Sequence, residues 1–190
     1  MTERVLFGLG NPGSRYRKTR HNAGWQTLAL LAEQHGAGFK RTRLIHGEVA
    51  DFRAGGLRIR MVEPHSFMNR VGPVYRRALK VYDVDPVDAL VVVDDFALPF
   101  GRLRLRAEGR PGGHNGLKSI QDAVGGPAYP RLRIGIGPVP EGQDPADYVL
   151  KRYDAAQRRE LPDLLDRAAD ACLYWASEGL EEAMNRFNAT

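Results

Sequence analysis

Short apolar runs alternate along the chain with longer segments in which apolar residues recur every three or four positions. The short runs are rich in Val, Ile and Leu and predict β-strands at Arg4–Leu9, Leu44–Phe52, Leu57–Val62, Ala89–Val93, Leu103–Arg106 and Leu132–Ile136. The longer segments predict helices at Asn22–His35, Val71–Val81, Gly116–Val124, Ala155–Ser177 and Leu180–Phe187. Strands and helices interspersed in this way indicate a layered α/β domain.

The order of these elements predicts an α/β fold: a single three-layer α/β/α domain over residues 1–190, with a mixed, mostly parallel central sheet and a C-terminal helical segment. The sheet is expected to be mixed because Leu44–Phe52 and Leu57–Val62 are close enough in sequence to form an antiparallel hairpin. The loop Gly137–Asp144 contains two prolines and two glycines. We interpret it as a hinge to a helical tail that packs on the same core.

Length and composition are those of a globular protein, since 190 residues with 43% hydrophobic content can bury a full core. No run approaches the ~18 apolar residues of a membrane span, and the first residues lack a signal-peptide pattern. We therefore expect a soluble, cytoplasmic protein. The single cysteine, Cys172, lies in Ala-Cys-Leu-Tyr-Trp, a setting typical of a packed core thiol rather than of a nucleophile.

Charge is distributed unevenly along the chain. Residues 1–140 hold 22 Lys and Arg against 12 Asp and Glu, whereas residues 141–190 hold 6 against 11. Most of the basic residues are arginines, whose planar guanidinium suits phosphate oxygens, although a GC-rich genome also raises arginine content. The basic part of the chain is therefore compatible with nucleic-acid binding without establishing it.

Unusual polar residues follow three of the predicted strands. Gly8–Gly13 follows the first strand, Pro64–Asn69 follows the third, and Asp94-Asp95 follows the fourth. In an open α/β sheet, ligands bind at the carboxyl ends of the strands. These three loops are therefore expected to meet at one crevice.

The spacing Gly8-x-Gly10-x-x-Gly13 matches a dinucleotide-binding fingerprint, but its context does not. Such a loop opens directly into a helix, whereas here Pro12 and the stretch 14–20 intervene. An acidic residue is also expected after a second strand about 20 positions later, and Glu33 lies in a helical segment instead. We interpret the motif as a turn that needs glycine.

His21 precedes the first predicted helix and is a candidate general base. An isolated histidine on a turn is usually a solvated side chain, but one carboxylate partner can tune its pKa for proton transfer near neutrality. Asp94 follows the apolar run Val91–Val93, where a partly desolvated acid needs a cation or a hydrogen-bond donor. Capping of a turn or helix is an equally good explanation of Asp94 and Asp95 from spacing alone.

Three asparagines, Asn11, Asn69 and Asn115, lie in or beside the candidate crevice loops. Any one of them is explained by a turn or a helix cap. Together they indicate more, because amide groups can orient a carbonyl, stabilise an oxyanion and hold a water without titrating.

Other hydrolytic and nucleotide-dependent chemistries lack their motifs. The sequence has no Gly-x-Ser-x-Gly elbow, no His-Glu-x-x-His zinc pattern, no cysteine pairs and no Gly-x-x-x-x-Gly-Lys-Ser/Thr loop. A water-activating histidine is the chemistry that remains.

The motifs taken together resemble those of bacterial-type peptidyl-tRNA hydrolase over almost the whole chain. The resemblance rests on Gly8-Leu-Gly-Asn-Pro-Gly13, Tyr16, Thr19-Arg-His-Asn22, Ser66-Phe-Met-Asn69, Asp94, Leu98-Pro-Phe-Gly101, Gly112-Gly-His-Asn-Gly-Leu117, Arg131-Leu-Arg-Ile-Gly-Ile-Gly137 and Ala183-Met-Asn-Arg-Phe-Asn188. It implies a monomeric enzyme without cofactor or metal. That enzyme hydrolyses the ester between a peptide and the 3′-terminal ribose of tRNA, which recycles tRNA after aborted translation.

The resemblance also implies roles for individual residues. His21 matches the catalytic base, Asp94 the acid that orients and polarises it, and Asn11 a position that helps to separate peptidyl from free aminoacyl substrates. The remaining matches are to substrate-binding positions. Asn69 and Asn115 match residues that position the substrate and water, Tyr16 and Phe67 match contacts to the tRNA 3′ end, and Arg106 and Arg133 match basic residues that meet phosphates.

Some positions depart from the family's usual pattern. Glu63 replaces a common lysine, and Ser66, Val71, Ala97 and Arg110-Pro111 also differ, but none of them removes a catalytic group.

Two rival functions remain to be considered. A non-catalytic RNA-binding module on the same fold is the main alternative, and it would tolerate loss of His21 or Asp94. A nicotinamide-dependent oxidoreductase is the other, and it requires binding of NAD.

Overall fold

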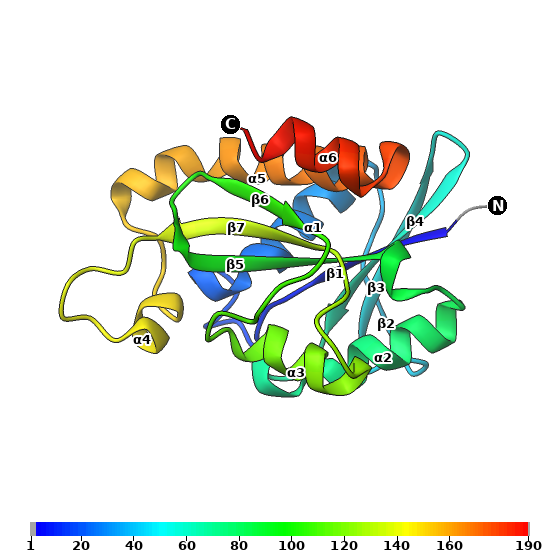
Figure 1. Ribbon diagram of the computed structural model, residues 1–190, viewed down its shortest axis with the longest axis horizontal. Coiled ribbons are helices and arrows are strands. Elements are labelled where there is room, and N and C mark those ends of the chain that lie inside the picture. The colour runs from blue at the N-terminus through cyan, green and yellow to red at the C-terminus, as the bar shows by residue number, and fades with distance from the viewer. Residues whose placement is uncertain (1–2, 190) are drawn as a thin grey trace.

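The computed structural model describes residues 3–189, which form one mixed sheet of seven strands covered by helices on both faces (Figure 1). The strand order is β2-β3-β4-β1-β5-β7-β6. The strands are β1 (Glu3–Gly8), β2 (Lys40–Thr42), β3 (Gly47–Ala54), β4 (Leu57–Pro64), β5 (Ala89–Pro99), β6 (Leu103–Arg106) and β7 (Arg131–Gly137). The four central strands β4, β1, β5 and β7 run parallel, and antiparallel pairs flank them at both edges. The predicted α/β class and mixed sheet are confirmed.

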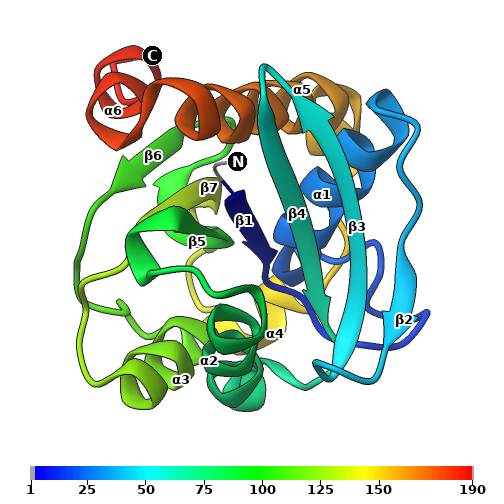
Figure 2. The same cartoon turned by 90° about the vertical axis from the view of Figure 1, so that its right-hand side faces the viewer.

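Helices cover both faces of this sheet, which gives the three predicted layers (Figure 2). One face carries α1 (Ala23–Gln34), α5 (Ala155–Glu178) and α6 (Leu180–Phe187), and the other carries α2 (Val71–Tyr82) and α3 (Asn115–Val124). A short helix α4 (Pro145–Val149) lies beyond the end of β7, and three 3₁₀ turns complete the chain: η1 (Arg20–Asn22), η2 (Met68–Arg70) and η3 (Pro86–Asp88).

Alternation of side chains along β1 explains why the sheet needs two helical layers. Val5 and Phe7 point to the layer of α2 and α3, whereas Leu6 points to the layer of α1 and α5. All three are fully buried, as expected for a parallel strand that is covered on both faces. The C-terminal helices pack on this same core, as predicted for the segment after the hinge, and Cys172 lies within it, fully buried.

The structure corrects the predicted boundaries in three places. The predicted strand Leu44–Phe52 begins only at Gly47 in β3, because residues 43–46 form a turn. The strand before that turn, β2, was not predicted, since a short polar strand gives no hydrophobic alternation to detect. Strand β5 continues through Asp94 to Pro99 instead of ending at Val93, with an irregularity after Asp95. Helix α4 was not predicted, although Asp144 caps its N-terminus and Pro145 follows, a pairing that favours a helix start.

Within residues 3–189, none of the helices combines the length and the apolar character needed to cross a membrane.

The single cysteine is a core residue, as expected. Burial raises the pKa of the Cys172 thiol, so this side chain is a poor nucleophile.

Candidate active site

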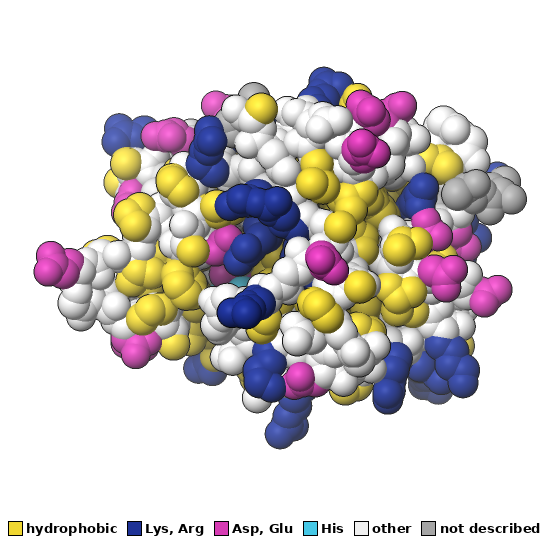
Figure 3. All heavy atoms as spheres, in the orientation of Figure 1, with side chains coloured by type: hydrophobic (Ala, Val, Ile, Leu, Met, Phe, Trp, Pro, Cys, Tyr) yellow, Lys and Arg dark blue, Asp and Glu magenta, His cyan; other side chains and the backbone are white. Residues whose placement is uncertain are grey.

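A cavity of about 920 Å³ lies at the carboxyl ends of β1, β4 and β5. Its lining includes Asn11 and Tyr16 after β1, His21 from η1, residues 67–70 after β4, Phe96 near the end of β5, residues 113–115 at the start of α3, and part of α4. The predicted meeting of loops at one crevice is therefore confirmed. In Figure 3, Lys and Arg side chains border a hollow near the middle of one face, and a His side chain is visible within it.

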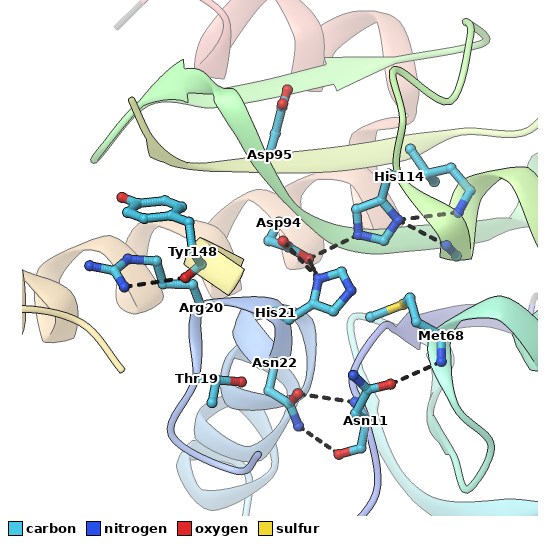
Figure 4. A network of polar contacts seen from close by, with 12 residues as sticks. Asn11, Thr19, Arg20, His21, Asn22, Met68, Asp94, Asp95, His114 and Tyr148 are labelled. Carbon is cyan, nitrogen blue, oxygen red and sulfur yellow. Dashed lines mark hydrogen bonds and ion pairs between the residues drawn. The ribbon is translucent and has the colours of Figure 1, made fainter. Parts of the chain in front are cut away.

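His21 and Asp94 face each other at the floor of this cavity (Figure 4). The Nδ1 atom of His21 lies 3.0 Å from Oδ2 and 3.1 Å from Oδ1 of Asp94. Asp94 is 2% exposed, so its carboxylate has little water to solvate it and depends on protein donors. Because His21 turns Nδ1 toward the acid, the Nε2 atom on the other side of the ring is the one available to the cavity.

A second imidazole, that of His114, also donates to Asp94. Nε2 of His114 lies 3.0 Å from Asp94 Oδ1, while its Nδ1 accepts hydrogen bonds from the backbone N–H groups of Gly116 and Leu117. An atom that accepts two N–H groups carries a lone pair, so the proton of neutral His114 is on Nε2. Asp94 therefore accepts from two N–H donors. The proton of neutral His21 is on Nδ1, because that atom faces the Asp94 carboxylate, which can only accept.

The pKa values follow from this arrangement. For Asp94, burial acts to raise the pKa, but the charges and hydrogen bonds of His21 and His114 outweigh it and hold the pKa far below its usual range. For His21, burial acts to lower the pKa, but the charge of Asp94 and its hydrogen bond outweigh that effect and leave the pKa raised. Asp94 is therefore ionised at neutral pH, and His21 gains its proton at a higher pH than an isolated histidine does.

Asn11 is held in a fixed orientation beside this pair. The Asn22 side chain, fully buried, donates from Nδ2 to the backbone O of Asn11 and accepts from its backbone N, both at 3.0 Å. The Asn11 side chain in turn accepts from the backbone N of Met68 through Oδ1, at 2.9 Å. With its oxygen engaged, Asn11 presents its Nδ2 group toward the side of the cavity where His21 lies (Figure 4).

The other predicted substrate contacts divide into two groups. Asn69 in η2 and Asn115 at the start of α3 are exposed side chains that line the cavity. Tyr16 and Phe67 line it as well, with their ring centroids 6.4 Å apart in an edge-to-face arrangement. Phe67 is 52% exposed, which is unusual for a large apolar side chain and leaves its ring available to a ligand.

Arg106 and Arg133 lie outside this cavity. Arg106, together with Arg102 and Arg104, borders a separate hollow of about 480 Å³ beside β6, which Asn188 also lines. Arg133 on β7 forms an ion pair with buried Asp95, with Nε 2.9 Å from Oδ2. The structure thus brings seven of the nine predicted site residues together, whereas Arg106 and Arg133 lie on a neighbouring surface.

The glycine motif at the end of β1 was interpreted as a turn that needs glycine, and this holds for Gly13, whose φ is 111°. Gly8 and Gly10 serve packing instead. A Cβ atom on Gly8 would approach Leu28 of α1 to 2.8 Å, and one on Gly10 would approach the Trp25 ring to 2.7 Å. Both contacts are closer than carbon atoms tolerate. These glycines let α1 lie directly against the strand end, and so they fix η1 and His21 at the edge of the cavity.

His21, Asp94 and His114 are also the one group of three potential metal ligands found among residues 3–189, with ligand atoms within 4.8 Å of one another. Ligation through Nε2 of neutral His114 would move its proton to Nδ1. That proton would then face the N–H groups of Gly116 and Leu117, which is unfavourable. The hydrogen bonds therefore favour a hydrogen-bonded triad over a metal site.

Three residues of this region were not singled out by the sequence: His114, Asn22 and Arg20. All three belong to motifs that were noticed, Gly112–Gly116 and Thr19–Asn22, but only neighbours in those motifs were given roles. Periodicity could not find them, because their importance lies in bonds to partners 11 to 137 positions away.

Glu63, which the resemblance marked as a departure, has an altered charge state. It is buried near the end of β4, directly opposite Glu48 on β3. Burial, and secondarily the charge of Glu48, raises the pKa of Glu63 to about 8, although Arg17 partly opposes the shift. This position thus holds an acid that is mostly neutral at pH 7.

Comparison with known proteins supports the resemblance inferred from the motifs. A family described as Peptidyl-tRNA hydrolase matches residues 5–190. Curated relatives named peptidyl-tRNA hydrolase include one from Chloroflexus aggregans, 45% identical over 97% of this chain and 98% of the relative, and one from Mycobacterium tuberculosis, 42% identical over 97% of each.

A crystal structure of peptidyl-tRNA hydrolase from Acinetobacter baumannii superposes with a TM-score of 0.91 at 33% identity, covering 98% of this chain and 94% of that one. Sequence and fold thus agree over nearly the full length, and the family match spans every loop that lines the cavity. The chain belongs to the peptidyl-tRNA hydrolase family.

Proposed function

We propose that this protein hydrolyses the ester bond between the peptide and the 3′-terminal ribose of tRNA in peptidyl-tRNA, with His21 as the general base. Family membership supports the reaction. The observation that carries the assignment of the base is the pairing of His21 with buried, ionised Asp94 in a cavity that also holds amide side chains.

In the first step, neutral His21 takes a proton from a water molecule through Nε2, and the water oxygen attacks the ester carbonyl carbon. Asp94 accepts from Nδ1, which holds the ring in place and stabilises the imidazolium that forms. His114 keeps Asp94 in position through Oδ1. A general base of this kind typically contributes about 10²–10⁴-fold to the rate.

The attack places negative charge on the carbonyl oxygen, which needs a donor. The Nδ2 groups of Asn11, Asn69 and Asn115 are the amide donors around the cavity, and one well-placed donor contributes about 2.7–4 kcal/mol. When the intermediate collapses, the bond to the ribose oxygen breaks and His21 returns its proton to that oxygen. The products are free tRNA and a peptide carboxylic acid, which loses its proton to water at neutral pH.

The two ends of the substrate call for two kinds of surface. Tyr16 and Phe67 offer ring faces and edges on which an unstacked base at the tRNA 3′ end can pack. Arg106 and Arg133, next to the cavity, offer guanidinium groups to phosphates. On its other side the cavity is lined by aliphatic side chains of α4, which suits a peptide of varied sequence.

The proposal includes the setting in which the protein works. We take residues 1–190 as a single functional domain that acts as a monomer, without metal or cofactor, in the cytoplasm. There it would recycle tRNA after aborted translation.

The test is release of peptide from a purified peptidyl-tRNA. The protein should release it, and His21→Ala should lower kcat by at least about 10²-fold with a much smaller effect on binding. His46→Ala is the matched control, since His46 is an exposed histidine outside the cavity. Binding of RNA with no release by the wild-type protein would instead support a non-catalytic RNA-binding module.

A further inference from the structure

Arg20 precedes the proposed base and is a buried arginine without a carboxylate partner among residues 3–189. It is 5% exposed. Burying a charged group without compensation is costly, so the guanidinium must be stabilised by other polar groups. The polar groups that contact the Arg20 guanidinium identify the segment that it holds in place.

The hydrogen-bond partners of Arg20 all lie between the last turn of α4 and the first turn of α5. Nη1 lies 2.8 Å from the backbone O of Arg152, 3.4 Å from that of Lys151 and 3.5 Å from that of Tyr148. Nη2 donates to Oε1 of Gln157 at 2.6 Å. The guanidinium therefore binds carbonyl groups at and just after the C-terminal end of α4, where partial negative charge collects.

The aromatic side chain of Tyr148 adds a further contact. The guanidinium carbon of Arg20 lies 4.1 Å from the centre of the Tyr148 ring, and the two side chains lie side by side in Figure 4. The Tyr148 hydroxyl donates to the backbone O of Ile136 on β7. Tyr148 of α4 is therefore held by Arg20 through its backbone O and its ring, and by β7 through its hydroxyl.

Helix α4 forms one wall of the cavity through Pro145, Ala146, Val149 and Leu150. The backbone of η1, which carries His21, is joined to the same segment by a bond from Arg20 N to Lys151 O and by a bridge between Thr19 and Arg152. The distance between this wall and His21 is therefore set by Arg20 and its carbonyl partners.

We propose that Arg20 is a positioning residue that fixes the α4 wall relative to His21 and thereby aligns the peptide part of the substrate with the base. This inference rests on the proposed function, since it takes the α4 side of the cavity as the place where the peptide lies. Arg20 itself touches no reacting atom.

The test compares Arg20→Lys with the wild-type protein on two substrates, tRNA carrying one N-acetylated amino acid and tRNA carrying an N-acetylated tripeptide. Lysine keeps the charge but loses the planar fork that reaches several carbonyls. KM should rise at least threefold more for the tripeptide substrate, because more of it lies along α4. Hydrogen exchange should become faster in residues 145–153.

A merely structural role would lower the active fraction, and so kcat, equally for both substrates. The proposal is overturned if folded Arg20→Lys shows wild-type exchange in residues 145–153 and an unchanged ratio of KM values. Arg158→Gln is the matched control, because exposed Arg158 also donates to a carbonyl of this segment, that of Tyr153, and should leave both readouts unchanged.

If Arg20→Lys fails to fold, Gln157→Ala and Asp154→Ala decide the question. Each removes one half of the capping box of α5, but only Gln157→Ala also removes a partner of Arg20. A larger KM effect and faster exchange for Gln157→Ala support the proposal, and equal effects overturn it. A wild-type protein that released no peptide would contradict the proposed function, while the exchange measurement would still test the hold of Arg20 on α4.

Discussion

At the scale of single residues, the central feature is one carboxylate shared by two imidazoles. Asp94 accepts from both His21 and His114, and the Nδ1 atom of His114 accepts from backbone N–H groups at the start of α3. The pKa of His21 therefore depends on how strongly Asp94 is also hydrogen-bonded to His114. Two substitutions should shift the pKa of His21 in opposite directions.

Asp94→Asn should lower kcat by at least about 10²-fold and move the acid limb of the pH profile to lower pH. The charge of Asp94 is what raises the pKa of His21 against the effect of burial, so burial dominates once that charge is removed. In the wild-type protein, activity should fall on acidification with a midpoint above the ordinary histidine value of about 6.5. A pH profile of kcat for both proteins provides the measurement, and identical midpoints would contradict the assignment of His21 as the titrating base.

His114→Asn should have the opposite effect on the midpoint. Asparagine can still cap α3, but its shorter side chain does not extend to Asp94 as the imidazole does. Relieved of one donor, the carboxylate holds the proton on His21 more tightly, so the acid limb should move to higher pH. The same pH series measures it, and a shift to lower pH would show that His114 does not compete for Asp94.

At the scale of elements, η1 places three consecutive side chains on three different partners. Arg20 binds the segment after α4, His21 binds Asp94 on β5, and Asn22 binds the loop after β1. A 3₁₀ turn has three residues per turn, so successive side chains diverge by about a third of a circle. This short turn thus connects three walls of the cavity.

Asn22→Ala should lower both stability and turnover. It leaves the backbone N and O of Asn11 without their partners, at a cost of about 1–3 kcal/mol for each group that stays buried, and it loosens the loop that carries Asn11. Denaturant unfolding and kcat on peptidyl-tRNA are the measurements.

Asn188→Ala is a matched control for this prediction. Asn188 makes the same pair of bonds, to the backbone N and O of Leu105, at a site outside the catalytic cavity. It should lower stability while leaving kcat near the wild-type value. Equal losses of kcat in the two variants would mean that Asn22 acts only through overall stability.

At the scale of the whole molecule, basic and acidic residues are concentrated in different parts of the structure. The basic excess belongs to residues 1–140, and Lys and Arg side chains border a hollow on the face shown in Figure 3. The acidic C-terminal part forms helices α5 and α6, which cover the core on one face of the sheet. Phosphates should therefore approach from the face that carries β6 and β7 rather than from the C-terminal helices.

Binding of tRNA should weaken as salt rises, because phosphate contacts release counterions. Arg106→Gln and Arg133→Gln should each reduce the slope of log affinity against log salt by about one. Arg58→Gln is the control, since Arg58 pairs with Asp51 at the start of β4, at the end of the strand away from the cavity. Slopes equal to that of the wild-type protein would remove the two arginines from the RNA contact.

Much of this architecture could be predicted from local pattern. Helices α1, α2, α3, α5 and α6 were predicted within one or two residues, because each buries an apolar stripe whose period is set by helix geometry. The crevice could be predicted as well, since polar residues after parallel strands meet at one edge of the sheet. Strand β2 and helix α4 could not, because a three-residue polar strand and a five-residue helix contain too few positions to show a period.

The sequence by itself determined the layered α/β fold, the family and the polar and aromatic side chains expected at the site, from Asn11 to Asn115. Only the tertiary structure decided how they act together. It placed Asp94 inside a strand, because two imidazoles from distant segments compensate its charge there, and it gave Arg20, Asn22 and His114 their roles. Local pattern reports what a residue does to its own helix or strand. A buried charge or amide is stabilised by partners far along the chain, and those partners are fixed only when the chain folds.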